Sequence, residues 1–154
     1  MSFDPTATLE TIQTHVRSLT DYFAEERVFI GTPPDAVLPT GLTAVIGMES
    51  MSVATTTLVS TVELHVVRIR IYRAKASGST NAIELQRDKV IPALLDVLKG
   101  DFTLGGGIRN IDWGGQYGIV PRVDFEDEEI ADAPYWTAHL VLPLIVDPTA
   151  VFVA

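Results

Sequence analysis

The 154-residue chain is acidic, with 20 Asp and Glu against 11 Lys and Arg and a formal charge of −9 at pH 7. Such a charge argues against general affinity for nucleic acid or anionic membranes, since both attract clustered Lys and Arg. Cysteine is absent, which excludes a disulfide scaffold, a thiolate nucleophile and a Cys-ligated metal site. With 47% hydrophobic residues, the sequence predicts one folded domain over residues 1–154, and neither a signal peptide nor a membrane span.

The first predicted element is an amphipathic helix over residues 4–24, with Asp4 as its N-cap and Pro5 at its first position. Its apolar face consists of residues spaced three or four positions apart: Leu9, Ile12, Val16, Leu19 and Phe23. A short β-prone run, Val28–Ile30, follows the helix. The chain is therefore expected to open with a helix that buries one face and a short strand.

A loop is predicted over residues 32–41, because its three prolines exclude a regular helix or a central strand. Val37 and Leu38 in this loop have no evident place in a core. We therefore expect the loop to be mobile in the free subunit and ordered in an assembly, with these two side chains at the interface.

A strand is predicted over residues 42–48, followed by a Ser/Thr-rich connection through Thr57 and by the longest β-type segment, residues 58–73. The apolar positions of that segment are even-numbered at first and odd-numbered later: Val62, Leu64 and Val66, then Ile69 and Ile71. Two causes explain such a change of phase, namely a β-bulge near Val66 and Val67, or a strand that buries its opposite face against another surface. The sequence alone leaves both open.

A second helix is predicted from Asn81 to about Lys99, where Asn81 and Glu84 have the form of a capping box. Pro92 removes a hydrogen bond inside this pattern, so we expect a kink or a restart there. Gly100 is the expected end of the helix.

Residues 101–118 combine β-prone residues with two glycine clusters, and an acidic connection over residues 124–133 leads to the last strand. Every second residue from Trp136 to Val146 is apolar, which predicts a strand with one buried face. The order of helix, strands, helix and strands predicts an α+β fold, a mainly antiparallel β-sheet with two α-helices packed on one face.

The sequence holds three histidines, His15, His65 and His139, but none belongs to a catalytic motif. A metal site between His65 and His139 on adjacent strands is a minor hypothesis beside surface or half-buried histidines. The glycine run at 104–110 lacks the spacing of a phosphate-binding loop, and no serine lies in a GxSxG elbow. The residues therefore indicate neither an enzyme nor a cofactor.

Charge is distributed unevenly along the chain. Segment 68–89 carries a net charge of +4, which leaves −13 for the rest. Separate basic and acidic surfaces on one small domain suit head-to-tail self-association, and the alternative is an ordinary solvated strand edge guarded by Arg and Lys. We predict that the following charged residues lie at an interface: Arg68, Arg70, Arg73, Asp127, Glu128 and Glu129.

Four motifs follow one another within residues 58–147: VVRIRIYRA, LxxxKVIPALLDVLKG, GDFTLGGGIRNIDWGGQYG and PYWTAHLVLPLIVD. In this order they resemble the tail terminator, or tail completion, proteins of long-tailed bacteriophages. The first 57 residues match that family in the order of their elements.

The resemblance implies a structural virion protein without a cofactor. Such proteins form a ring, typically of six subunits, on the head-proximal end of the tail tube, where the ring stops polymerisation and offers a docking face to the neck. The implied partners are other copies of this chain, the tail tube protein and a neck or head-completion protein. Genomic DNA would pass through the lumen without specific binding. The implied location is the tail–neck junction of the virion, after assembly in the bacterial cytoplasm.

Two alternatives stay open at this point. A neck or head–tail connector protein also forms rings and has a similar size and charge. A small cytoplasmic enzyme or ligand-binding domain would instead use His65 and His139 with nearby carboxylates.

Overall fold

The computed structural model describes residues 3–32, 34–36, 38, 41–56, 61–75 and 86–147. The helical elements over these residues are α1 (Pro5–Arg17), a 3-10 turn η1 (Glu25–Arg27), a π-helical turn η3 (Gln86–Val90) and α3 (Ile91–Lys99). The strands are β1 (Val28–Ile30), β2 (Leu42–Thr56), β3 (Thr61–Ala74), β4 (Asn110–Ile111), β5 (Arg122–Ile130) and β6 (Ala133–Val146).

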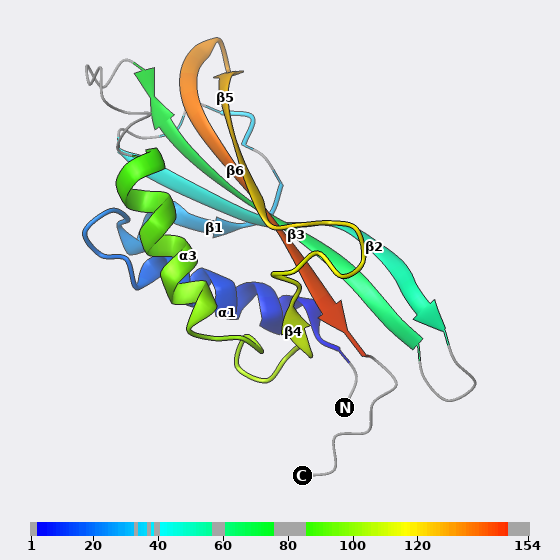
Figure 1. The fold of residues 1–154 in the computed structure, drawn as a ribbon. Helices are drawn as coiled ribbons and strands as arrows, with labels where there is room; N and C mark the ends of the chain where they lie inside the picture. The colour runs from blue at the N-terminus through cyan, green and yellow to red at the C-terminus, as the bar shows by residue number, and fades with distance from the viewer. Residues whose placement is uncertain are drawn as a thin grey trace.

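The strands form one mixed sheet in the order β1-β2-β3-β6-β4, and β5 also pairs with β6. Strand β1 runs parallel to β2, whereas the other pairs of described strands are antiparallel. Helices α1 and α3 lie on the same face of this sheet (Figure 1). The predicted α+β fold, a mainly antiparallel sheet with two helices on one face, is confirmed.

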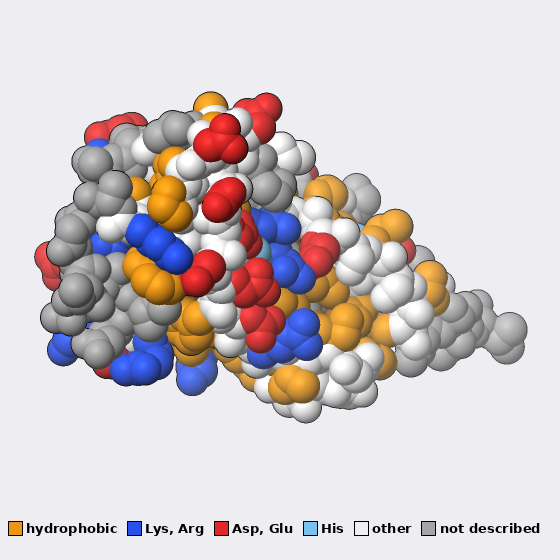
Figure 2. Space-filling model, turned by 90° about the horizontal axis from the view of Figure 1, so that it is seen from above, with side chains coloured by type: hydrophobic (Ala, Val, Ile, Leu, Met, Phe, Trp, Pro, Cys, Tyr) orange, Lys and Arg blue, Asp and Glu red, His pale blue; other side chains and the backbone are white. Residues whose placement is uncertain are grey.

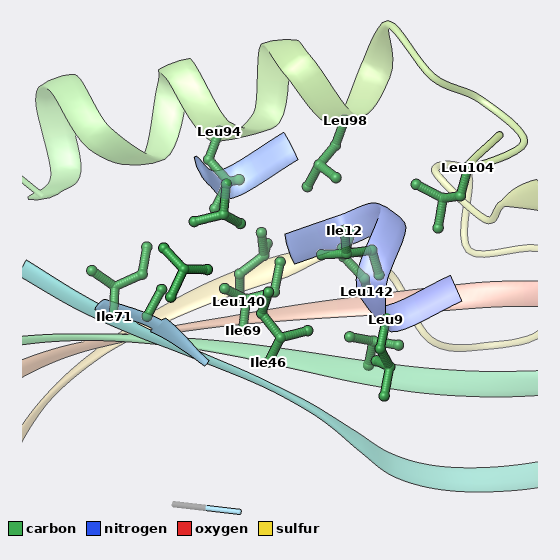
Figure 3. Packing of buried hydrophobic residues seen from close by; sticks show 14 of the residues in the cluster. Leu9, Ile12, Ile46, Ile69, Ile71, Leu94, Leu98, Leu104, Leu140 and Leu142 are labelled. Carbon is green, nitrogen blue, oxygen red and sulfur yellow. The ribbon is translucent and has the colours of Figure 1, made fainter. Parts of the chain in front are cut away.

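The main core lies between the two helices and the sheet. Apolar side chains of α1 and α3 meet alternate residues of β2, β3 and β6, as Figure 3 shows for Leu9, Ile12, Leu94, Leu98, Ile46, Ile69, Ile71, Leu140 and Leu142. Burying one such side chain contributes about 1.5–3 kcal/mol, so this layer holds the helices on the sheet. Among the helices that the structure describes, none is long and apolar enough to cross a membrane.

Helix α1 begins as predicted, because the Asp4 carboxylate accepts a hydrogen bond of 3.1 Å from the backbone N–H of Ala7. It ends at Arg17, however, so the prediction of a helix through residue 24 is wrong in its last turns. Ser, Thr and Asp residues follow at 18–21, and their short polar side chains compete with the helix for backbone hydrogen bonds. Phe23 is buried all the same, so the apolar spacing indicated burial rather than helix.

Strand β2 continues to Thr56, so the predicted connection after residue 48 is wrong. The Ser/Thr-rich segment pairs with β3 along its length, which its β-branched and small residues permit. The register of β2 against β3 shifts between Met48 and Ser50 and again between Val53 and Thr55. The extra residues of these register shifts therefore lie in β2, and the first shift is opposite the part of β3 where the apolar positions change phase.

Strand β3 itself stays in continuous register with β6. Its phase change has the second of the two expected causes, because β3 buries apolar residues on both faces. Even-numbered residues are buried on one face (Val62, Leu64, Val66) and odd-numbered residues on the other (Val67, Ile69, Ile71).

The second helix restarts as predicted. A π-helical turn precedes α3, and Pro92 lies in the first turn of α3, where its missing N–H costs nothing. Gly100 forms the C-cap as expected. The predicted capping box of Asn81 and Glu84 lies outside the described residues.

The acidic segment was expected to be a connection, but it forms β5, and this prediction is wrong. Residues 122–130 pair with β6 along nine positions. An edge strand tolerates many charges because one of its sides and part of its surface stay in water. Strand β5 therefore presents its carboxylates in two alternating rows, one on each face of the sheet.

Candidate interaction site on the face opposite the helices

Alternation along the strands divides the sheet into a helix face and a second face, here called the distal face. Residues that pair across strands share a face, so the pairs Arg68–Val141 and Arg70–His139 lie on the distal face. Strand β5 contributes its even-numbered residues to the same face, namely Arg122, Asp124, Glu126, Glu128 and Ile130. The distal face therefore brings basic residues of β3 next to acidic residues of β5, with β6 between them.

A row of charged groups crosses four strands of this face. The guanidinium of Arg68 donates to both carboxylate oxygens of Glu49, at 2.9 and 2.7 Å, and to Nδ1 of His139 at 3.2 Å. On its other side, His139 Nε2 lies 2.5 Å from Glu128 and 3.7 Å from Glu126. His139 is buried, so this row, here called the charge row, links β2 to β5 through the interior of the face. Figure 2 shows one side of the molecule on which acidic and basic side chains lie directly beside each other.

The neighbours of His139 fix its tautomer. Because an arginine can only donate, Nδ1 of His139 accepts, and in the neutral ring the hydrogen is on Nε2 and is donated to Glu128. A metal-binding histidine has the reverse arrangement, in which the second ring nitrogen donates to an acceptor. Although Glu126, Glu128 and His139 lie close enough to hold a metal ion, Arg68 makes this donor set unsuitable for one.

The three predicted interface arginines have different surroundings. Arg68 is bound within this chain, by Glu49 and His139 of the charge row. Arg70 lies beside His139 on the distal face, half-buried, and makes no ion pair with any residue that the structure describes. Arg73 pairs with Trp136 on the helix face, with its Nε buried and unpartnered among the described residues. The structure therefore brings two of the three arginines together on one face.

The predicted acidic residues also divide between faces. Glu128 belongs to the charge row. Asp127 and Glu129 pair with Trp136 and Pro134, on the helix-face side of β5, and both are exposed. Asp127 forms an ion pair with Lys75, in which Nζ of Lys75 lies 3.3 Å from Oδ2 of Asp127. The Lys75 ammonium also lies 4.0 Å from the centre of the Trp136 ring, which joins β3, β6 and β5 at that end of the sheet.

Leu38 packs on the distal face, contrary to the expectation that it has no place in a core. Its backbone N–H donates to the hydroxyl of Tyr135 at 2.9 Å, and its side chain contacts a small cluster that contains Tyr72 and Tyr135. No sequence pattern indicated this cluster, because tyrosines on a predicted polar face have no apolar periodicity. Val37 lies outside the described residues.

Tyr72 adds a buried polar group beside the charge row. The pKa of Tyr72 is raised to about 12, first by burial and second by the nearby Glu128 carboxylate, while Arg70 acts in the opposite direction. Tyr72 is neutral at pH 7, as an unperturbed tyrosine also is, so it adds no charge beside the carboxylates of β5.

The other two histidines lie away from the charge row: His65 is on the opposite face of the sheet, and His15 is on α1. His65 pairs with Leu144 on the helix face, where it contacts Glu63 and the ring of Phe3, which rules out the minor hypothesis of a metal site between His65 and His139. The two residues are on neighbouring strands but on opposite faces. His15 on α1 instead forms a 2.8 Å contact with Asp101 after α3.

The two outer edges of the sheet differ in chemistry. Strand β1 pairs with β2 only at Ala44–Ile46, so the part of β2 beyond Gly47 has no outer strand partner among the described residues. There the side chains of Met51 and Val53 are 63% and 61% exposed. The opposite edge, β5, is acidic, and of its residues Arg122 alone is basic.

No protein-family model matches the chain. No curated protein matches it either. Among solved structures, the chain is similar to a chain in the virion of a native gene transfer agent particle, with a TM-score of 0.45 and 13% sequence identity over 92% of both chains.

Proposed function

We propose that this protein is a tail terminator, which forms a ring of six subunits on the head-proximal end of a phage tail tube. The resemblance of residues 58–147 to that family suggests this role. The observation that carries it in the structure is the chemical difference between the two edges of one sheet: β5 is acidic, whereas the outer part of β2 is Ser/Thr-rich and exposes two apolar side chains, Met51 and Val53.

Unlike edges suit a head-to-tail contact. In such a contact each subunit offers one surface to the neighbour on one side and a different surface to the other, and the chain of contacts closes into a ring when the rotation permits. An exposed edge strand with apolar side chains makes a monomer prone to aggregation, whereas in a ring the neighbouring subunit covers it. Met51 and Val53 are the first residues that such a neighbour would bury.

Within this proposal, the charged residues have separate tasks. Arg70, Asp127 and Glu129 reach the surface and contact a neighbouring subunit or the tube. Arg68 and Glu128 hold the distal face in shape from within, through His139. Leu38 is held on the distal face by its hydrogen bond to Tyr135, and at that point it contributes to the contact with a partner.

Capping follows from the physics of open assemblies. A tube grows because the upper face of each ring accepts the lower face of the next, and such a series has no internal stop. A terminator matches the tube on one face and mismatches it on the other, and excess negative charge contributes to the mismatch through like-charge repulsion. Six contacts that act together allow each contact to be weak.

The test is to withhold the protein during tail assembly and to measure tail length by negative-stain electron microscopy. Overlong tubes that fail to join heads, restored to normal by adding the wild-type protein, are expected. Tubes of normal length that fail to join heads would point instead to a neck or head–tail connector. Normal tubes that join heads would refute any role at this junction.

A further inference from the structure

The sheet has a long strand at each outer side, and each of these strands has one side without a strand partner among the described residues. On β2 this open side begins after Gly47, because β1 pairs with β2 at residues 44–46. Within it, two register shifts bound a regular stretch from Ser50 to Val53. On β5 the open side is the one that faces away from β6. A row of unpaired backbone N–H and C=O groups is a template for a strand of another chain.

The side chains along these two open sides alternate in the same way. On the helix face, β2 exposes Met51 and Val53, and β5 carries Phe125, which is 37% exposed. On the distal face, β2 carries Ser52 and β5 carries Asp124. If the two strands paired with their helix faces on the same side, apolar residues would lie opposite apolar residues. Hydroxyl groups would lie opposite carboxylates, to which they can donate.

Charge favours this combination of edges over a pair of identical edges. Residues 50–56, SMSVATT, contain no charged side chain, so an acidic strand meets no like charge there. Two copies of β5 side by side would instead place carboxylates opposite carboxylates, which is destabilising. Two copies of β2 side by side would form a closed dimer and leave both acidic strands open.

The strand directions fit a head-to-tail contact. Strand β2 is antiparallel to β3, β3 to β6 and β6 to β5, so β2 and β5 of one subunit run in opposite directions. A head-to-tail neighbour repeats the sheet without turning it over. Its β5 therefore arrives antiparallel to β2, with the helix faces of both subunits on the same side.

The two edges lie at different levels of the sheet. In Figure 1 the outer part of β2 extends beyond the helices at one end, and β5 lies toward the other end. Phe125 is level with Ile71 of β3, and Met51 is level with His65, a stagger of about 20 Å along the strands. Four strands are about 19 Å wide. A contact with this stagger inclines the strands by about 45° to the ring axis, close to the tilt of strands in closed barrels.

We propose that β5 of one subunit pairs with the outer part of β2 of the next subunit, with Phe125 opposite Met51 and Val123 opposite Val53. The two strands are antiparallel, and main-chain hydrogen bonds continue the sheet from one subunit to the next. This inference rests on the proposed assembly into a ring and names the two surfaces that meet in it.

Disulfide formation between chains tests the proposed register, since the chain has no cysteine of its own. Met51→Cys and Phe125→Cys, mixed at the highest soluble concentration under mild oxidation, should form a mixed dimer, because opposite residues of paired strands have Cβ atoms about 4.5–5.5 Å apart. Ser52→Cys mixed with Phe125→Cys is the matched control. It should form the mixed bond at least tenfold less, because Ser52 lies on the distal face.

The other outcomes of this experiment overturn the proposal. Equal yields in the two mixtures, or no mixed bond in either, would exclude the proposed register. Bonds formed mainly between two Met51→Cys chains would show that two copies of β2 pair instead. The double variant Met51→Cys/Phe125→Cys should form a series of covalent oligomers larger than a dimer, and a series that stops at the dimer would exclude a head-to-tail contact.

Hydrogen exchange of the wild-type chain tests the main-chain pairing without a substitution. In samples that sedimentation velocity shows to be assembled, outward-facing amides of residues 50–53 and 123–126 should exchange at least tenfold more slowly than in the dilute monomer. Unchanged exchange at either edge would overturn the proposal.

The outcomes for this contact and for the terminator role are distinguishable. Overlong tubes on withholding the protein, without the mixed disulfide, would support the role and reject this contact. The mixed disulfide together with normal tails that join heads would support the contact and reject the role.

Discussion

Arg68 and Arg70 are two residues apart on β3 and face the same side of the sheet, yet their surroundings differ. Arg68 donates to Glu49 and to His139, whereas Arg70 has no ion pair with a described residue. Sequence spacing correctly placed both on one face. It could not distinguish them, because Glu49 and His139 are 19 and 71 positions away from Arg68 and meet it only through the register of β2, β3 and β6.

The first prediction concerns these two arginines. Arg68→Met should lower the free energy of unfolding by about 1–2 kcal/mol, because it leaves the buried His139 nitrogen and a carboxylate without their donor. Arg70→Met, the matched control, should change it by less than about 0.5 kcal/mol. Urea unfolding of both variants measures the difference. Equal losses would mean that the charge row does not stabilise the fold.

A second prediction concerns Asp101, which joins the loop after α3 to α1. Burial raises the pKa of this carboxyl, but hydrogen bonds from the backbone N–H of Gly105 and from His15 outweigh it and hold the pKa below its ordinary value of 3.8. Because the folded-state pKa is depressed, the stabilisation is present above pH 3.8 and is lost as the pH falls through the lower folded value.

Asp101→Asn should therefore lower the free energy of unfolding by about 1 kcal/mol at pH 7. The difference from the wild-type chain should shrink as the pH falls below 3.8 and through the lower folded-state pKa, where the folded wild-type carboxyl becomes neutral too. Thermal unfolding at pH 7, 5 and 3 measures it. A difference that is constant over this range would indicate a steric effect of the substitution.

Among whole elements, those with a local signal could be predicted. The start of α1 depends on Asp4 and Pro5, the restart of α3 on Pro92, and β6 on strict alternation over Trp136 to Val146. The second half of β2 and all of β5 had no such signal. Serine, threonine and carboxylate residues form strands there because β3 and β6 offer them paired backbone groups, which is a tertiary effect.

Helix α1 gives a prediction on the scale of one element. Asp4→Ala removes the acceptor for the Ala7 N–H and should lower the free energy of unfolding by about 1 kcal/mol. Asp4→Asn keeps a side-chain oxygen at the N-cap and should cost only a few tenths of that value. Chemical unfolding of both variants compares them. A loss of the same size in both would assign the effect to the negative charge near the helix N-terminus rather than to the hydrogen bond.

On the scale of the whole molecule, the histidines show where sequence reasoning stops. Their number and the polar character of their strands were evident, but whether His65 and His139 share a face depends on the register of β3 against β6. That register places them on opposite faces, and it brings His139 into contact with Arg68 and Glu128. The distribution of net charge along the chain was evident as well. The position of the acidic strand β5 at the edge of the sheet opposite the outer part of β2 depended on the strand order.

The last prediction tests whether the exposed apolar side chains on the outer part of β2 take part in assembly. If a neighbouring subunit covers the outer part of β2, then Met51→Lys and Val53→Lys each bury an unpaired charge in the contact, and self-association should weaken at least tenfold, a change of about 1.4 kcal/mol per contact. Neither change should alter the free energy of unfolding of the monomer by more than about 0.5 kcal/mol, because both side chains are more than half exposed.

Ser52→Lys is the matched control, since it adds the same charge to the same strand on the distal face. Sedimentation velocity over a range of concentrations measures the association. If the control weakens it as much as the two variants do, charge in general opposes assembly, and if none of the three weakens it, the contact between subunits lies away from this edge.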